Sequence, residues 1–167
     1  SHIGNVPQNP FLFSESIEDN IRFGKRDATE EEIFEASKKA AIHKSIKKFS
    51  QGYKTLLGER GLTLSGGQIQ RVSIARALIK NPKILLFDDC LSAVDTDTEE
   101  KILKNLKEFS QEKTTIIVSH RISSVKDADH IIVLDHGKII EQGTHKKLLD
   151  TKGFYLDLFN KQLNEKE

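Results

Sequence analysis

The segment "LSGGQ", from Leu64 to Gln68, has residue types and spacing suited to binding phosphate. Two adjacent glycines let the backbone approach a bulky anion, and Ser65 adds a hydroxyl donor. The apolar stretch that follows, residues 68–80, predicts a helix whose first N–H groups and positive dipole end face the same anion. In isolation, a Gly-Gly turn with a serine cap would explain the segment equally well.

Two carboxylates, Asp88 and Asp89, end the apolar run "KILLFDD". In α/β proteins, ligands bind outside the carboxyl ends of the strands. Asp88 could hold Mg²⁺ directly or through water, because this cation prefers oxygen ligands and keeps several waters. Asp89 could orient or deprotonate an attacking water. Taken alone, a pair of solvated carboxylates at a strand end is the commoner explanation.

His120 and Gln8 are weaker candidates for the same chemistry. His120 ends the apolar run "TTIIVSH", where its imidazole could bond a phosphate oxygen and the attacking water. Gln8 lies between two prolines, and its amide could reach the metal or the water. Each residue alone carries little information, so only the neighbouring motifs make them candidates.

Helices and turns are expected around these residues. Pro, Asn, Ser and aromatic side chains are mixed over residues 6–24, which predicts loops and turns. Capping patterns and apolar periodicity predict helices from Thr29 to about Phe49, from Gln68 to Lys80, from Asp97 to about Phe109, after Thr144, and from Gly153 to Leu163.

The apolar runs 83–89 and 114–120 predict strands that are buried on both faces. Residues 130–143 predict a hairpin that turns at Asp135-His136-Gly137. Buried strands that alternate with helices indicate an α/β fold with a mainly parallel sheet. The stretch 27–80 shows no strand pattern and is expected to be a helical insert.

Composition narrows the classes of function. The chain has 167 residues, which suits about one domain. Its 26 Lys and Arg against 25 Asp and Glu argue against a surface for nucleic acid or anionic membrane that spreads over the whole chain. Cys90 is the single cysteine, which rules out an internal disulfide. No apolar run approaches the ~18 residues of a membrane span, so another segment or chain would have to supply one.

Taken in order, these motifs resemble the ABC-transporter ATPase family, and the resemblance covers nearly the whole chain. The segments "SAVD" and "GERG" add to it, the latter being similar to the X-loop of ABC exporters. The resemblance implies these roles: Gln8 as the Q-loop glutamine, Glu59 in the X-loop, Ser65, Gly66, Gly67 and Gln68 as the signature, Asp88 as the Walker B aspartate, Asp89 as the catalytic base, Asp95 as the D-loop aspartate and His120 as the switch histidine.

The resemblance implies a truncated P-loop NTPase fold of the ABC ATPase type, with a mainly parallel sheet and an α-helical subdomain. Residues 1–26 would hold the Q-loop and the start of the helical subdomain, and residues 27–80 the helical subdomain with X-loop and signature. Residues 81–167 would form the C-terminal part of the RecA-like core, with the Walker B motif, D-loop and H-loop. The implied function is an exporter motor that binds and hydrolyses ATP with Mg²⁺. Its partners would be a second nucleotide-binding domain and a transmembrane domain of the same polypeptide, at the cytoplasmic face of the membrane, with no nucleic acid.

One departure from the family is that the motif G-x-x-x-x-G-K-[ST] does not occur in the sequence. The family's phosphate loop and first strands precede the Q-loop, so we expect them before Ser1. That loop supplies most contacts to the triphosphate. The isolated chain is therefore expected to bind ATP very weakly, to hydrolyse none, and to expose strand edges and apolar surface.

A second departure is Asp89, which stands where the family usually has Glu. Its side chain is one methylene shorter, and water activation depends on close placement, so hydrolysis should be slower by orders of magnitude. An intact signature beside such a base resembles one half of a heterodimeric exporter with one impaired site. A homodimer with slow hydrolysis is the other arrangement that the sequence allows.

Two further classes of function compete with the exporter. One is a non-transport ABC ATPase that acts on DNA or ribosomes, against which the balanced charge and "GERG" weigh. The other is a non-catalytic interaction module that docks to a partner domain. The identity of the cargo cannot be read from these residues.

Overall fold

The computed structural model describes residues 2–58 and 63–164. The chain divides into two compact units, Ser1–Val118 and Ser119–Glu167, and each is described by itself below. Glu59, the expected X-loop residue, lies outside the described residues. Within the described residues, no helix has both the length and the apolar character needed to cross a membrane.

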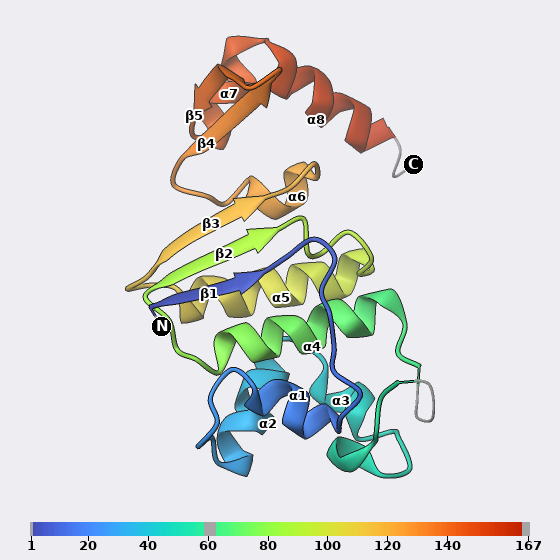
Figure 1. The fold of residues 1–167 in the computed structure, drawn as a ribbon. Helices are drawn as coiled ribbons and strands as arrows, with labels where there is room; N and C mark the ends of the chain where they lie inside the picture. Colours follow the sequence, from blue (N-terminus) through green and yellow to red (C-terminus); the bar gives the residue numbers. More distant parts are fainter. Residues whose placement is uncertain (1, 59–62, 165–167) are drawn as a thin grey trace. The chain divides into compact units, whose positions relative to one another are not determined.

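The first unit contains a parallel sheet with the strand order β1 (Ile3–Val6), β2 (Ile84–Asp88) and β3 (Thr114–Val118) (Figure 1). The parallel pairing of β2 with β3 confirms the predicted sheet. No strand was predicted at β1, because four residues that include Gly4 and Asn5 show no strand pattern. Since all strands are parallel, their carboxyl ends lie at one edge, which is where the candidate residues follow.

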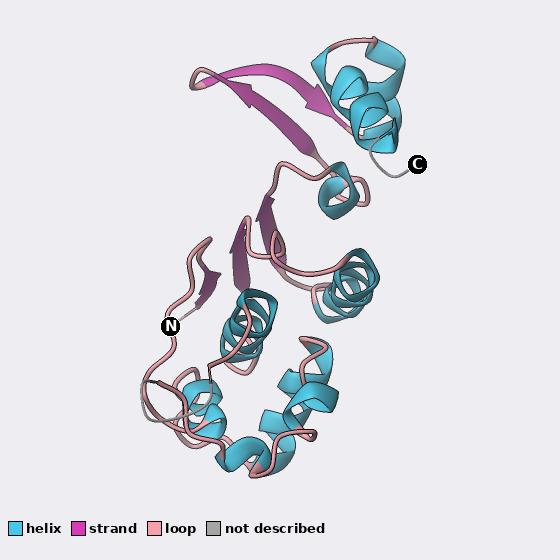
Figure 2. Ribbon diagram, turned by 90° about the vertical axis from the view of Figure 1, so that its right-hand side faces the viewer, coloured by secondary structure: helices cyan, strands magenta, loops and turns pink. Residues whose placement is uncertain are grey.

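Among the described residues of this unit, helices cover one face of the sheet: α4 (Gly66–Leu78) and α5 (Thr96–Phe109), as Figures 1 and 2 show. Leu85 and Phe87 point to that face and are buried. Ile116 and Val118, on the opposite face, are each 50% exposed. The prediction that the strands are buried on both faces was therefore wrong, and the expected exposure of apolar surface is confirmed.

The helical part of the first unit contains α1 (Ile17–Arg22), α2 (Glu30–Lys39), α3 (His43–Ile46) and the short 3₁₀ helix η1 (Gly52–Lys54). The sequence predicted one helix from Thr29 to Phe49, but it breaks at Ala41, whose φ of 54° is left-handed. The break turns the chain so that Ile42 and Ile46 are fully buried, and this burial outweighs the helix propensity of alanine.

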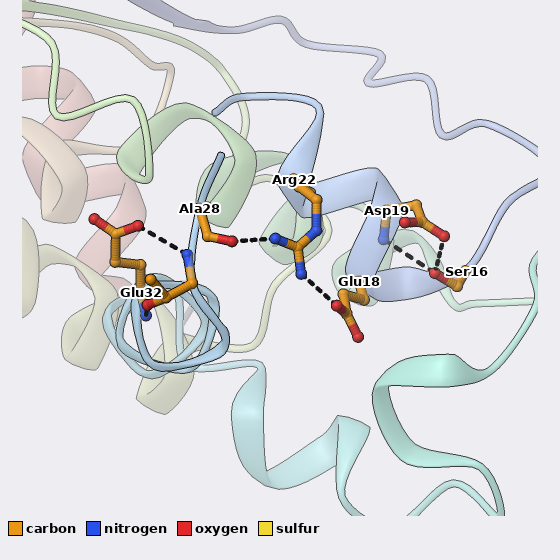
Figure 3. Close-up of polar contacts among 7 residues, drawn as sticks. Ser16, Glu18, Asp19, Arg22, Ala28 and Glu32 are labelled. Atoms are coloured by element: carbon orange, nitrogen blue, oxygen red, sulfur yellow. Dashed lines mark hydrogen bonds and ion pairs between the residues drawn. The ribbon is translucent and has the colours of Figure 1, made fainter. Parts of the chain in front are cut away.

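Side chains fix where these helices begin (Figure 3). The Ser16 hydroxyl accepts a hydrogen bond from the N–H of Asp19, at 3.0 Å. The Glu32 carboxylate accepts one from the N–H of Thr29, also at 3.0 Å, which confirms the predicted capping box. Arg22 pairs with Glu18 and donates to the carbonyl of Ala28, which ties α1 to the start of α2.

Helix α5 begins two residues earlier than predicted. Its cap is Asp95, not Asp97, and the Asp95 carboxylate accepts a hydrogen bond from the N–H of Thr98 at 2.9 Å. Asp95 has the extended backbone that a capping residue needs. Asp97 lies in the first turn, where its negative charge still favours the helix dipole.

The second unit contains α6 (Ile122–Val125), an antiparallel hairpin of β4 (Ile131–Asp135) and β5 (Lys138–Gly143), α7 (His145–Thr151) and α8 (Phe154–Asn164). The predicted hairpin is confirmed, since His136 and Gly137 both have positive φ, as its tight turn requires. Thr144 caps α7 as predicted. The small core of this unit contains Ile122, Ile131, Leu148 and Tyr155.

Candidate functional site

Ser65 is the N-cap of α4. Its hydroxyl oxygen accepts a hydrogen bond from the N–H of Gln68 at 3.3 Å, and its own N–H donates to the Gln68 amide oxygen at 2.9 Å. These bonds show that Ser65 caps α4, which was the simpler of the two explanations for the segment. They do not use the hydroxyl proton of Ser65, which can still be donated to an anion. The side chain is exposed at the end of the helix.

The two glycines differ in how closely they approach their surroundings. A β-carbon on Gly67 would lie 2.7 Å from the carbonyl oxygen of Ala93. On Gly66 it would lie 3.4 Å from the Ala93 side chain, an ordinary contact. Gly67 is therefore needed for the start of α4 to pack on the 92–95 segment, while Gly66 is exposed.

Gln70 joins α4 to the loop that follows β2, and sequence reasoning missed it. Its side chain is only 5% exposed. The amide oxygen accepts from the N–H of Ala93 at 3.1 Å, and the amide nitrogen donates to the Ser92 hydroxyl at 3.3 Å. The Ser92 hydroxyl in turn donates to the carbonyl of Asp89 at 3.0 Å. The sequence did hold one signal for Gln70: its amide falls on the apolar side of the predicted helix, where a polar group needs a hydrogen-bond partner.

Gln8 and Asp89 come together at the carboxyl edge of the sheet. The Gln8 amide nitrogen lies 3.5 Å from a carboxylate oxygen of Asp89, although 81 residues separate them in the chain. Asp88 ends β2 with an exposed side chain. Asp89 has a φ of 43°, a left-handed conformation that aspartate tolerates better than most residues.

Arg71 binds the signature turn and interacts electrostatically with Asp95. The Arg71 guanidinium donates to the carbonyl of Gly67 at 3.1 Å and to the carbonyl of Ala41 at 2.8 Å. The hydrogen bond from Thr98 N–H, and more weakly the charge of Arg71, hold the pKa of Asp95 below its usual value. Partial burial lowers the pKa of Arg71. Sequence reasoning missed this arginine as well.

Arg76, in α4, binds the segment 11–20 that follows Gln8. Its guanidinium donates to the carbonyl of Asn20 at 2.7 Å, to the Asn20 amide oxygen at 2.7 Å and to the carbonyl of Phe11 at 2.8 Å. It also lies over the rings of Phe13 and Phe23, at 5.4 and 5.8 Å. One helix thus carries the signature turn and holds the chain that follows Gln8.

The structure gives less support to His120 and to a metal site. His120 is an exposed residue of the second unit, and its carbonyl accepts a hydrogen bond from Gln162 at 2.7 Å. Its catalytic role stays a prediction. Across residues 2–58 and 63–164, no three or more His, Cys, Asp or Glu side chains gather closely enough to hold a metal ion by themselves.

Comparisons with known proteins agree with these observations. The profile of the family described as ABC transporter matches residues 1–92. The ABC transporter ATP-binding protein YknU of Bacillus subtilis is 50% identical over 165 residues, which are 99% of this chain and 28% of that protein. The mitochondrial iron-sulfur clusters transporter ABCB7 of Oryzias latipes is 47% identical over 161 residues, 96% of this chain and 22% of that protein.

A solved structure, that of a bacterial Atm1-family ABC exporter with ATP bound, superposes with a TM-score of 0.91 at 47% identity. The match covers 96% of this chain and 28% of the exporter. The chain thus spans about a quarter of the length of the proteins it matches. With its signature turn, its strand-end carboxylates and these matches, the chain belongs to the ABC transporter family and has the fold of an ABC ATPase.

Proposed function

We propose that this chain is part of the ATP-binding and ATP-hydrolysing motor of an ABC exporter, at the cytoplasmic face of the membrane. The motor would couple ATP-driven pairing of two such domains to export. The observation that carries the proposal is the turn at Ser65, Gly66 and Gly67, an open helix N-terminus packed through Gly67 on the 92–95 segment. The matched proteins are transporters, which favours this function over the two alternatives.

In this proposal the signature turn binds the terminal phosphate of an ATP that a second ABC domain holds mainly through its own phosphate loop. The hydroxyl of Ser65 donates a hydrogen bond, and the N–H groups of Gly66 to Gln68 and the positive end of α4 add electrostatic attraction. This contact exists only when the two domains are closed, so ATP shifts the pair toward the closed state and hydrolysis reopens it.

The residues at the carboxyl edge of the sheet have donors that suit Mg²⁺. Asp88 offers an exposed carboxylate. Gln8 uses its amide nitrogen toward Asp89, so its amide oxygen is the atom suited to a cation. Since Mg²⁺ keeps several waters and binds nucleotide phosphates, two protein ligands are enough. The ion, when bound, would neutralise negative charge on the phosphates.

Asp89 would orient the attacking water, with the Gln8 amide beside it and His120 contacting the phosphate. Its left-handed backbone and its contact with Gln8 set the direction of the short side chain. Asp95 would contact the partner domain near the second nucleotide. Glu59 and the segment held by Arg76 would pass the movement to a transmembrane domain of the same polypeptide.

The binding role of Ser65 can be separated from its capping role. Asp and Asn both cap helices as well as Ser does, so Ser65→Asp and Ser65→Asn should leave α4 intact. Only Asp places a negative charge against the phosphate. In the complete transporter reconstituted in lipid, Ser65→Asp should abolish ATP-driven pairing and slow hydrolysis at least about a hundredfold, while Ser65→Asn keeps more activity. Equal activities of the two variants would contradict the proposal.

The aspartate at position 89 leads us to place this chain in a heterodimer, where its signature completes the fast site of the partner. Asp89→Asn should then reduce turnover mildly, and Ser65→Arg severely. The reverse ranking would refute that arrangement. Equal, severe losses would instead match a homodimer that hydrolyses ATP slowly through Asp89.

A further inference from the structure

The loop from Asp89 to Ala93 is held to α4 by a chain of hydrogen bonds that lies beneath the site. Gln70 donates to the Ser92 hydroxyl, and that hydroxyl donates to the carbonyl of Asp89, at 3.3 and 3.0 Å. The other end of the Gln70 amide accepts from the N–H of Ala93 at 3.1 Å. Because Gln70 is buried, loss of either bond would leave a polar group without a partner in the core.

This chain of bonds acts on a residue whose backbone conformation is unfavourable. Asp89 has a φ of 43°, and such conformations persist only where the surroundings fix them. On one side, the N–H of Asp89 donates to the carbonyl of Val118 at 2.8 Å. On the other side, its carbonyl accepts from Ser92. The second contact is oriented by Gln70, so the direction of the Asp89 carboxylate depends on a residue of α4.

The same stretch of chain also contacts the signature turn. Gly67 packs against the carbonyl of Ala93, the residue whose N–H binds Gln70. Movement of the first turn of α4 is thus passed to the Asp89 loop by a steric contact and by a hydrogen-bonded one. In the proposed function these two places serve different nucleotides, since α4 faces the partner's ATP and Asp89 faces the chain's own site.

We propose that Gln70 and Ser92 are positioning residues that hold Asp89 in its left-handed conformation and couple it to the signature turn of the same chain. In this proposal they act through Asp89 and not on the nucleotide itself. The coupling between sites rests on the proposed function, whereas the holding of Asp89 can be tested without any activity.

Hydrogen exchange measured by mass spectrometry on the complete protein tests the holding directly. Ser92→Ala removes only the hydroxyl, and Gln70→Glu keeps the acceptor for Ala93 N–H but loses the donor to Ser92. Both should raise exchange in peptides that span residues 86–94 by roughly fivefold to tenfold, the factor expected for loss of one such bond. The exposed change Gln111→Glu is the matched control and should leave exchange as in the wild type.

If Gln70 and Ser92 only stabilised the fold in general, hydrogen exchange would change in a different pattern. If exchange rises equally in peptides from α1, or does not rise at residues 86–94, the proposal is overturned.

ATP hydrolysis adds a second readout: Gln70→Leu should lower kcat by about as much as Asp89→Asn, with KM for ATP unchanged within about threefold. In the Asp89→Asn background, Gln70→Leu should cause a smaller loss than it does in the wild type, because its effect through Asp89 is already gone, and a fully additive loss would overturn the proposal. A wild type without ATPase activity would refute the proposed function, while the exchange result would still decide the role of Gln70 and Ser92.

Discussion

A β-carbon added to Gly67 would lie 2.7 Å from the carbonyl oxygen of Ala93. Two motifs that are 26 residues apart are therefore parts of one packed structure. The first turn of α4 and the loop after β2 cannot move independently, because the steric contact at Gly67 and the bonds of Gln70 both join them. This relationship explains why a glycine, rather than any small residue, is needed at position 67.

Gly67→Ala should destabilise the chain by about 1–3 kcal/mol, since backbone atoms rather than a flexible side chain must move to make room. Gly66→Ala is the matched control: its β-carbon meets the Ala93 side chain at an ordinary 3.4 Å, and the change should alter stability by less than about 1 kcal/mol. Urea unfolding followed by circular dichroism measures both. Equal effects of the two substitutions would show that the Gly67 contact has no special importance.

Arg76→Lys should destabilise the chain by about 2 kcal/mol, although the charge is kept. Lysine cannot reproduce the planar fork that binds the carbonyls of Phe11 and Asn20 together with the Asn20 side chain. The loss should be local, so limited proteolysis should cut within residues 11–20 of the variant first. Arg26→Lys, at an exposed position, is the control and should be cut like the wild type. Unchanged cleavage in Arg76→Lys would mean that other contacts hold this segment.

Cys90 should make stability depend on pH in the alkaline range. The thiol is 2% exposed, and burial raises its pKa to about 12. Its pKa in the unfolded chain is about 8.5, so the folded state binds the proton more tightly. The stabilisation is complete below about pH 8.5 and falls as pH rises toward 12, by at most about 1.4 kcal/mol per pH unit.

Urea unfolding at pH 7.5 and pH 10 checks this dependence against Cys90→Ala, which has no thiol to titrate. The wild type should lose more stability over this interval than the variant does. The folded wild type should also resist iodoacetamide at pH 8, because the thiolate is the reactive form. Equal pH dependence in both proteins, or rapid alkylation of the folded chain, would contradict the burial of Cys90.

Much of the fold followed from local patterns in the sequence. The capping box at Thr29, the hairpin turn at His136-Gly137 and the helix after Thr144 all depend on neighbouring residues, and all were predicted. The errors arose where contacts with residues distant in the sequence determine the local structure. The break at Ala41 depends on burial of Ile42 and Ile46, and β1 exists because it pairs with a strand about 80 residues later.

The candidate site divides in the same way. Ser65, Asp88 and Asp89 could be chosen from their motifs, because residue type and order alone suggest phosphate and metal chemistry. Arg71 and Arg76 could not, because their importance lies in which carbonyls each one reaches across the fold. For Gln70 the sequence showed only an amide on the apolar side of a helix and not the hydroxyl that it binds. The helix start is a separate, local error, since the helix was predicted to begin at Asp97 and Asp95 is the residue that caps it.

The central claim is that the turn at Ser65 to Gln68 binds the terminal phosphate of a nucleotide held mainly by another domain. A structure of the complete protein trapped with ATP tests it most directly. We expect the Ser65 hydroxyl and the N–H groups of Gly66 to Gln68 within about 3 Å of the γ-phosphate oxygens of that nucleotide. A trapped, ATP-bound dimer in which this turn faces away from every nucleotide would contradict the claim.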